Sequence, residues 1–198
     1  GTSTSVRGFP EADTNGFEMD VIYAPTNELL IGGNFSYTDA KYSKEMVDAL
    51  GNVGVIDDNN PYAPSSIYTI RERNIPVKGM QMQRIPELKA SAYLNYTQEL
   101  SDGRVDYLVG YSWTDSILWD DSGMSLDTSP AFDRLDIKAT WTNNEENLEI
   151  MAFVNNVMDE IGVRNMTADG EQLGYQRSIT PTLPRMGGIS FTYKFGAY

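Results

Sequence analysis

The stretch that decides the fold is residues 88–113, LKASAYLNYTQEL-SDG-RVDYLVGYSW. In each half every second side chain is apolar, from Leu88 to Tyr96 and again from Val105 to Trp113, and most side chains between them are polar. A period of two is the pattern of a β-strand with two different faces, and the SDG segment is typical of a tight turn. The stretch therefore predicts an antiparallel hairpin with one apolar face.

The same alternation extends outward from this hairpin in both directions. Proline, which removes a hydrogen bond from a β-ladder, is absent from every alternating segment. Strands that follow one another across short turns pair in antiparallel fashion. We therefore predict an all-β, antiparallel up-and-down sheet of seven strands. The five further segments are 17–23, 29–38, 135–141, 148–155 and 189–195.

The composition excludes several classes of function. The 198 residues contain no His and no Cys, so the chain holds no Ser-His-Asp triad, thiol nucleophile, zinc finger or iron–sulfur site. With 15 basic and 28 acidic side chains, the net charge of −13 argues against a nucleic-acid partner. The Asp and Glu residues form no recognisable acid–base pair. We therefore predict no enzyme activity, no catalytic residue and no cofactor.

Two regularities favour a transmembrane barrel over a soluble one. The connections alternate between short and long, and outer-membrane barrels have short periplasmic turns and long external loops. The apolar faces tend to begin or end in an aromatic residue, as at Tyr23, Tyr96 and Trp141, and such rings favour the two membrane–water interfaces. A soluble sandwich or barrel also alternates, with its apolar face inward. The long connections lie near 41–84, 115–131 and 157–184.

The long connections carry the side chains that we expect to contact a ligand. Aromatic rings stack on sugars or on aromatic ligands, and guanidinium groups bind anions. The alternatives are that the rings pack the loops on each other and that the basic groups, including Lys78, pair with loop acids. The candidates are Tyr62, Tyr68, Arg71, Arg73, Trp119 and Tyr175.

Acidic residues give a weak indication of a cation site. Oxygen ligands at this density suit a hard ion such as Ca²⁺, and the 115–127 segment contains no base. The spacing matches no binding loop of defined geometry, and neither does that of the run 57–60. We therefore predict ordinary solvated loops and no metal site. The weak candidates are Asp120 and Asp121, with Asp115 and Asp127 in the same loop.

Four segments resemble those of one known family. Residues 15–20, NGFEMD, look like the opening of a late barrel strand in the TonB-dependent outer-membrane receptors, and residues 37–42, YTDAKY, look like the run that leaves the next strand. Residues 153–159, FVNNVMD, resemble that family's V-x-N-L-x-D run. Residues 184–195, PRMGGISFTYKF, resemble its closing P-R-x-x-G strand. The four occur in the family's order.

The resemblance implies that residues 1–198 form about the last seven strands of a 22-stranded barrel, with the plug domain and the earlier strands absent. It implies a receptor in the outer membrane of a Gram-negative bacterium, in contact with lipid, that takes up a siderophore, cobalamin or glycan. Its energy would come from a TonB-type coupling complex through the absent plug. Tyr193, Phe195 and Tyr198 would form the signal for the barrel-assembly machinery.

Two other interpretations are compatible with the alternation. One is a soluble β-sandwich or lipocalin-like binding module, and the other is a smaller complete barrel with a structural or adhesive role. If the chain is a piece of a larger barrel, seven strands leave two unpaired edges. We then expect the isolated chain to self-associate through those edges.

Overall fold

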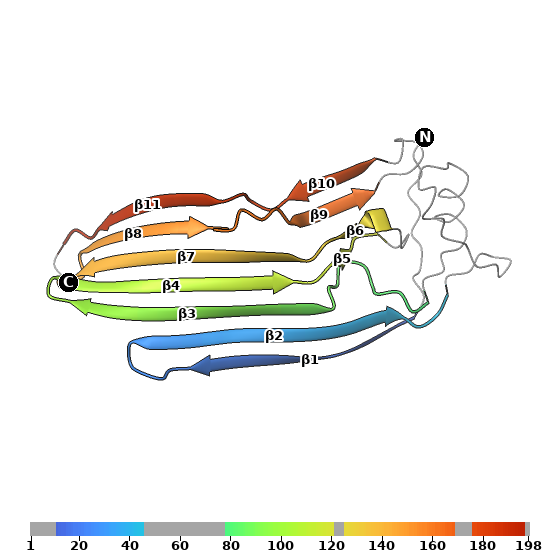
Figure 1. Ribbon diagram of the computed structural model, residues 1–198, viewed down its shortest axis with the longest axis horizontal. Helices are drawn as coiled ribbons and strands as arrows, with labels where there is room; N and C mark the ends of the chain where they lie inside the picture. The colour runs from blue at the N-terminus through green and yellow to red at the C-terminus, as the bar shows by residue number, and fades with distance from the viewer. Residues whose placement is uncertain (1–10, 46–77, 121–124, 169–175, 197–198) are drawn as a thin grey trace.

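The computed structural model describes residues 11–45, 78–120, 125–168 and 176–196 (Figure 1). Its main element is one seven-stranded antiparallel sheet with the order β1-β2-β3-β4-β7-β8-β11. Each strand therefore lies beside the next main strand in the chain, in the predicted up-and-down order. The strands are β1 (Ala12–Tyr23), β2 (Leu29–Tyr42), β3 (Leu88–Leu100), β4 (Gly103–Thr114), β7 (Phe132–Asn143), β8 (Leu148–Asn155) and β11 (Met186–Tyr193).

All seven predicted strands are present, and most are longer than the alternating segments. β2 continues to Tyr42, where its backbone N–H donates to the carbonyl O of Met80 at 3.1 Å. The sheet is open, because β1 and β11 lie at its two edges and do not pair with each other. An open sheet with this strand order is consistent with a part of a larger barrel.

One face of the sheet is apolar across its whole width. The strand register aligns Ile31, Leu94, Val109, Ile137 and Val154 in a single row that crosses five strands. Four of these side chains rank among the exposed large hydrophobic residues of the chain, and so do Ile189 and Phe191 on the edge strand β11. A broad exposed apolar surface is expected where lipid or another partner covers it.

Aromatic side chains border this apolar face at both ends. Tyr96 and Tyr107 stack at one end, with ring centroids 6.2 Å apart. Phe17 and Tyr37 lie 6.1 Å apart at the other end. Between Val105 and Trp113, β4 has about the 9–11 residues that a tilted strand needs to cross a bilayer.

The opposite face of the sheet is polar. Its side chains also align in rows, one of which contains Asp20, Asn34, Ser91, Ser112 and Arg134. Because neighbouring residues of a strand point to opposite faces, the alternation in the sequence becomes a separation of apolar from polar surface.

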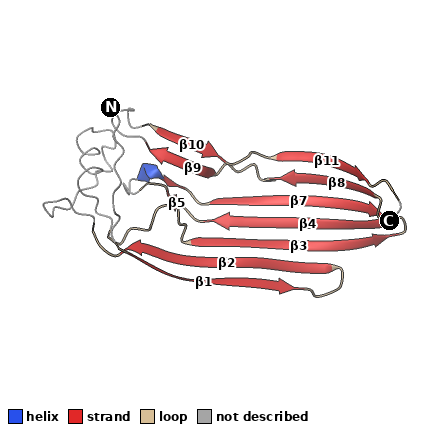
Figure 2. Cartoon of the chain, turned by 180° about the vertical axis from the view of Figure 1, so that it is seen from behind, coloured by secondary structure: helices blue, strands red, loops and turns tan. Residues whose placement is uncertain are grey.

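The short and long connections lie at opposite ends of the sheet (Figure 2). The turns 24–28, 101–102 and 144–147 lie at the end that we call the turn end, and β11 also finishes there. The other end, which we call the loop end, carries the long connections. This one-sided arrangement agrees with the alternation of connection lengths in the sequence.

Two of the long connections contain strands that the alternation did not reveal. Residues 115–131 include β5 (Ile117–Leu118) and β6 (Thr128–Ser129), which pair with each other, and the short 3-10 helix η1 (Ser125–Asp127). Residues 156–185 include the hairpin of β9 (Val163–Ala168) and β10 (Arg177–Pro181). These strands are too short or too irregular to show a period of two, and β10 shifts register at Thr180/Pro181.

The buried apolar side chains of the described residues lie at the loop end rather than along the sheet. They are Ala40, Tyr42, Trp119 and Met166. Among the described residues, no helix has the length and apolar character to cross a membrane.

Candidate ligand-binding surface

The loop end is a folded surface built from two of the long connections. In the 115–131 connection, the backbone N–H of Trp119 donates to the carbonyl O of Asp127 at 2.8 Å, which closes the β5–β6 hairpin. The indole Nε1–H of Trp119 donates to Ser129 Oγ at 2.9 Å. Only 8% of Trp119 is exposed. The ring of Trp119, which was predicted to contact a ligand, therefore packs inside its own connection.

A buried ion pair joins this connection to the next one. Arg177 on β10 donates from Nε to Asp127 Oδ1 at 2.9 Å. Asp127 is fully buried, and the Arg177 side chain is 13% exposed. Although the 115–127 segment contains no basic residue, the charge of Asp127 is therefore balanced by Arg177, which lies far along the chain.

This pairing bears on the candidate cation ligands. Asp127 is engaged by Arg177, and Asp115 Oδ1 accepts the backbone N–H of Ser116 at 2.7 Å. Among the residues that the structure describes, no group of three or more His, Cys, Asp or Glu side chains is placed to hold a metal ion. Asp120 lies just after Trp119 at the end of its described segment, and Asp121 lies outside the described residues.

Most of the other predicted contact residues fall outside the described part of the chain. Tyr62, Tyr68, Arg71, Arg73 and Tyr175 lie in segments 46–77 and 169–175, as does the acidic run 57–60. The backbone N–H of Lys78, at the edge of the first of these segments, donates to the Glu45 carboxylate at 3.3 Å. These candidates therefore stay predictions.

A second set of contacts holds the two ends of the 156–185 connection together. Asn156 is 1% exposed, and its Nδ2 donates to the carbonyl O of Glu160 at 2.7 Å and of Leu183 at 3.1 Å. Its Oδ1 accepts the backbone N–H of Glu160 at 3.1 Å. Its φ of 53° lies in the left-handed region, which Asn tolerates better than most residues.

Asp159 and Arg185 complete this set. The backbone N–H of Arg185 donates to Asp159 Oδ1 at 2.8 Å, and the Arg185 guanidinium donates to the carbonyl O of Val157 at 3.1 Å. The FVNNVMD and PRMGGISFTYKF segments, which were recognised separately in the sequence, are thus hydrogen-bonded to each other. Together they close the base of the 156–185 connection.

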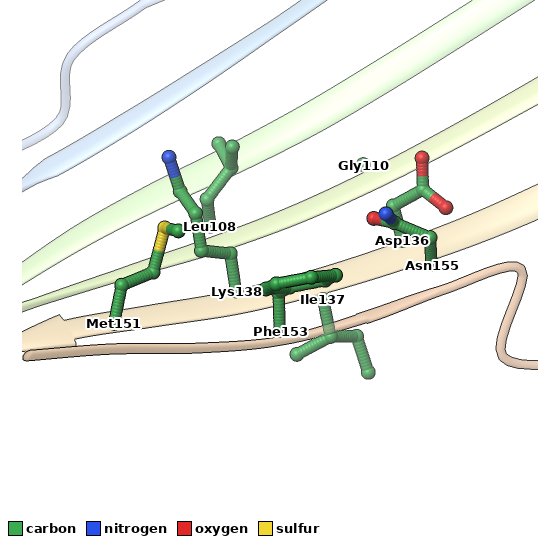
Figure 3. A pocket seen from close by; sticks show the side chains of 8 residues that line it. All are labelled: Leu108, Gly110, Asp136, Ile137, Lys138, Met151, Phe153 and Asn155. Carbon is green, nitrogen blue, oxygen red and sulfur yellow. The ribbon is translucent and has the colours of Figure 1, made fainter. Parts of the chain in front are cut away.

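The polar face contains a hollow of about 450 Å³ between β4, β7 and β8 (Figure 3). Its apolar part consists of Leu108, Met151 and Phe153, and the Lys138 amine lies beside them. Ile137, the neighbour of Lys138, points to the other side of the sheet. The hollow therefore offers an apolar surface and a positive charge to whatever lies against this face.

Acidic and basic groups flank this hollow. Arg134 Nε donates to both oxygens of Asp136, at 2.8 and 2.9 Å, and the backbone N–H of Asn156 also donates to Asp136 Oδ1, at 2.7 Å. Asp136 is thus neutralised locally. It also connects the hollow to the contacts that fix the 156–185 connection.

The turn end has its own charged pair. Arg104 Nη1, at the start of β4, donates at 2.8 Å to Oε1 of Glu146, which lies in the turn between β7 and β8. This hydrogen bond, and then the charge of Arg104, lower the pKa of the Glu146 carboxyl below its ordinary value. Nearby, the predicted assembly residues Tyr193 and Phe195 contact edge to face, with centroids 4.7 Å apart, and Tyr198 lies outside the described residues.

The comparison with known families decides the classification of this chain. The profile described as "TonB dependent receptor-like, beta-barrel" matches residues 1–157. The chain belongs to the TonB-dependent receptor β-barrel family. It is therefore a protein of the Gram-negative outer membrane.

Solved structures of TonB-dependent receptors have the same fold. The ferric yersiniabactin uptake receptor FyuA from Yersinia pestis aligns with a TM-score of 0.69 and 14% identity, over 93% of this chain and 24% of that one. The siderophore receptor PiuA from Acinetobacter baumannii aligns with a TM-score of 0.64 and 19% identity, over 93% and 22%. The chain thus spans about a quarter of the length of these receptors.

A third similar structure is the ferric-catecholate import receptor Fiu from Escherichia coli K12, with a TM-score of 0.61 and 17% identity, over 93% of this chain and 21% of that one. A search of curated protein sequences gives no significant match. At these identities the solved structures bear on the fold alone, and the family match confirms the transmembrane barrel over the alternative of a soluble sandwich.

Sequence reasoning did not find the pairing of Asp127 with Arg177. Both residues lie in polar loops, and the sequence around each of them contains no pattern that indicates which residue it pairs with. The contact between Asp159 and Arg185 could have been predicted from the sequence, because both residues lie in segments that resemble those of the TonB-dependent receptors. Charged residues of opposite sign in two such segments are a signal that a contact prediction can use.

Proposed function

We propose that this chain forms the C-terminal part of the barrel of a TonB-dependent receptor that takes up an iron–siderophore complex. In this proposal the seven main strands supply part of the barrel wall, and the loop end supplies part of the external surface that the ligand meets. The plug domain and the earlier strands belong to the remainder of the receptor. Energy reaches the receptor from a TonB-type complex through that plug.

The observation that carries the proposal is the separation of the two faces together with the folded loop end. An apolar face with aromatic borders suits a lipid-facing wall, and the polar face then lines the lumen. FyuA takes up ferric yersiniabactin, PiuA is a siderophore receptor, and Fiu imports ferric catecholates. These three receptors favour a siderophore over cobalamin or a glycan as the ligand of this one.

The experiment uses the intact receptor in a host that lacks its own siderophore receptors. Cells are supplied with radioactive iron as catecholate, hydroxamate or mixed-ligand complexes, with labelled cobalamin and an oligosaccharide as alternatives. We expect energy-dependent uptake of iron from at least one ferric complex, and loss of that uptake when the coupling complex is deleted. Uptake of cobalamin or the oligosaccharide in place of iron would contradict the proposed ligand class.

A further inference from the structure

The contact between Asp127 and Arg177 joins two long connections through a buried charge. The two residues lie 50 positions apart, in two different long connections, and yet the Asp127 carboxylate is fully buried. Burial of a charge is costly unless a partner neutralises it, and removal of one partner of a buried pair leaves the other uncompensated. Removal of one partner of this pair should therefore disturb the contact between the two connections more than removal of one partner of an exposed pair would.

Each partner of the pair is fixed to its own hairpin. The carbonyl O of Asp127 accepts the backbone N–H of Trp119, which is itself held by Ser129. Arg177 begins β10, where it lies opposite Ala168 of β9 in the register. Because both hairpins are hydrogen-bonded internally, the ion pair joins two ordered bodies rather than two free loops.

A third segment is attached to the same body. The backbone N–H of Arg84 donates to the carbonyl O of Leu118 on β5 at 2.6 Å. The end of the 43–87 connection is thereby tied to the β5–β6 hairpin. All three long connections of the chain thus have described parts that meet beside Asp127.

We propose that Asp127 and Arg177 are positioning residues that join these connections into one rigid body and that ligand affinity depends on this rigidity. This inference rests on the proposed function, in which the external loops meet the ligand. Neither residue contacts the ligand in this account. A surface that is already ordered loses less conformational entropy when a ligand binds.

The first part of the test measures rigidity in the intact receptor without any ligand. Spin labels are attached to Ser116→Cys and Ser178→Cys, two exposed positions in the two connections, in a receptor that has no other cysteine. Pulsed electron paramagnetic resonance then gives the distribution of distances between them. We expect a narrow distribution in the parent receptor and a broad one after Asp127→Asn or Arg177→Gln.

The second part measures binding of ferric tris-catecholate, the probe, by the same receptors. We expect its Kd to rise about tenfold in Asp127→Asn and in Arg177→Gln. The two cysteines of Asp127→Cys/Arg177→Cys are then joined by a short bis-methanethiosulfonate reagent, which forms a disulfide with each thiol and releases methanesulfinate, because an arginine spans more distance than a direct disulfide. The cross-linked receptor should regain the parent Kd, and a reducing agent that cleaves the link should remove the gain.

A matched control is available at the same end of the sheet. Asp39 and Lys41 form a 2.8 Å ion pair whose side chains are 33% and 47% exposed. Asp39→Asn should change neither the distance distribution nor the Kd. Heat-dependent migration of the folded barrel on gels confirms that each variant has assembled.

Three outcomes would overturn the inference. The first is a distance distribution that stays narrow in both variants, and the second is an unchanged Kd in both. The third is a cross-linked receptor whose affinity for the probe stays low, because Arg177 would then act by contacting the probe. The distance measurement requires no ligand, so it tests the inference even where the siderophore proposal fails.

Discussion

The two ends of the sheet are held together by different kinds of interaction. At the turn end, the β3–β4 ladder continues to its last pair, Leu100 with Gly103, and a short turn joins the strands. At the loop end, buried polar side chains such as Asn156 and Asp127 hold the backbone. The turn end thus rests on strand ladders closed by short turns, with exposed pairs such as Arg104–Glu146 added to them, whereas the loop end depends on buried side chains that bond to distant segments.

This difference predicts how the two ends respond to substitution. A change that blocks a strand ladder at the turn end should disturb the whole wall, because each strand pairs along most of its length. A change at the loop end should loosen one connection and leave the wall intact. The predictions below run from the largest expected effect to the smallest.

The largest effect is expected from Gly103→Ala at the turn end. Gly103 has a φ of +155°, and a Cβ there would lie inside van der Waals distance of the Thr142 carbonyl O on β7. The substitution should destabilise the assembled barrel by about 3 kcal/mol or more, because both the dihedral and the ladder must adjust. Denaturant unfolding of the intact receptor measures this.

Gly110→Ala is the matched control, since a Cβ at Gly110 on the same strand meets nothing within 4 Å. Its stability should stay within about 1 kcal/mol of the parent. Equal losses in the two variants would contradict the argument from close approach.

Asn156→Ala should have a smaller and more local effect at the loop end. It removes the hydrogen bonds to the backbone of Glu160 and Leu183 and leaves buried groups unsatisfied, at a cost of about 2 kcal/mol. Hydrogen exchange should rise in the described parts of 157–185 and stay unchanged in β3 and β4. The exposed Asn144→Ala is the control, and a uniform rise along the sheet would contradict the proposed division of the two ends.

The smallest effect is expected from pH at the Arg104–Glu146 pair. Because the pKa of Glu146 is lowered in the folded protein, the pair stabilises the turn above the unfolded pKa of the carboxyl and loses this effect as the pH falls through the folded pKa. Glu146→Gln should therefore be slightly less stable than the parent at neutral pH and equal to it once the pH is below the folded pKa of Glu146. The difference should shrink in high salt, because the pair is exposed. A difference that grows toward low pH would have the wrong sign.

The same comparison explains what the sequence could predict. The seven main strands could be read because Leu88–Trp113 and its counterparts alternate without interruption, and the register follows from short turns. The strands β5, β6, β9 and β10 could not, because two-residue strands show no period and β10 breaks its register at Pro181.

The candidate site was predicted less completely than the wall. Trp119 was placed correctly in a long connection, but the packing of its ring against Ser129 depends on how the hairpin folds. The partner of Asp127 is 50 residues away and on a different hairpin. Pairings of this kind arise from tertiary packing, and no local pattern encodes them.

The central claim is that adjacent residues of each main strand face lipid and lumen, and one measurement tests it most directly. In the intact receptor in lipid vesicles, single spin labels at Ile137 and Lys138 are compared for their collisions with oxygen, which dissolves in lipid, and with a nickel chelate, which stays in water. We predict that the label at position 137 meets oxygen and the label at 138 meets the chelate. Equal exposure of both positions to the chelate, or the reverse pattern, would contradict the account.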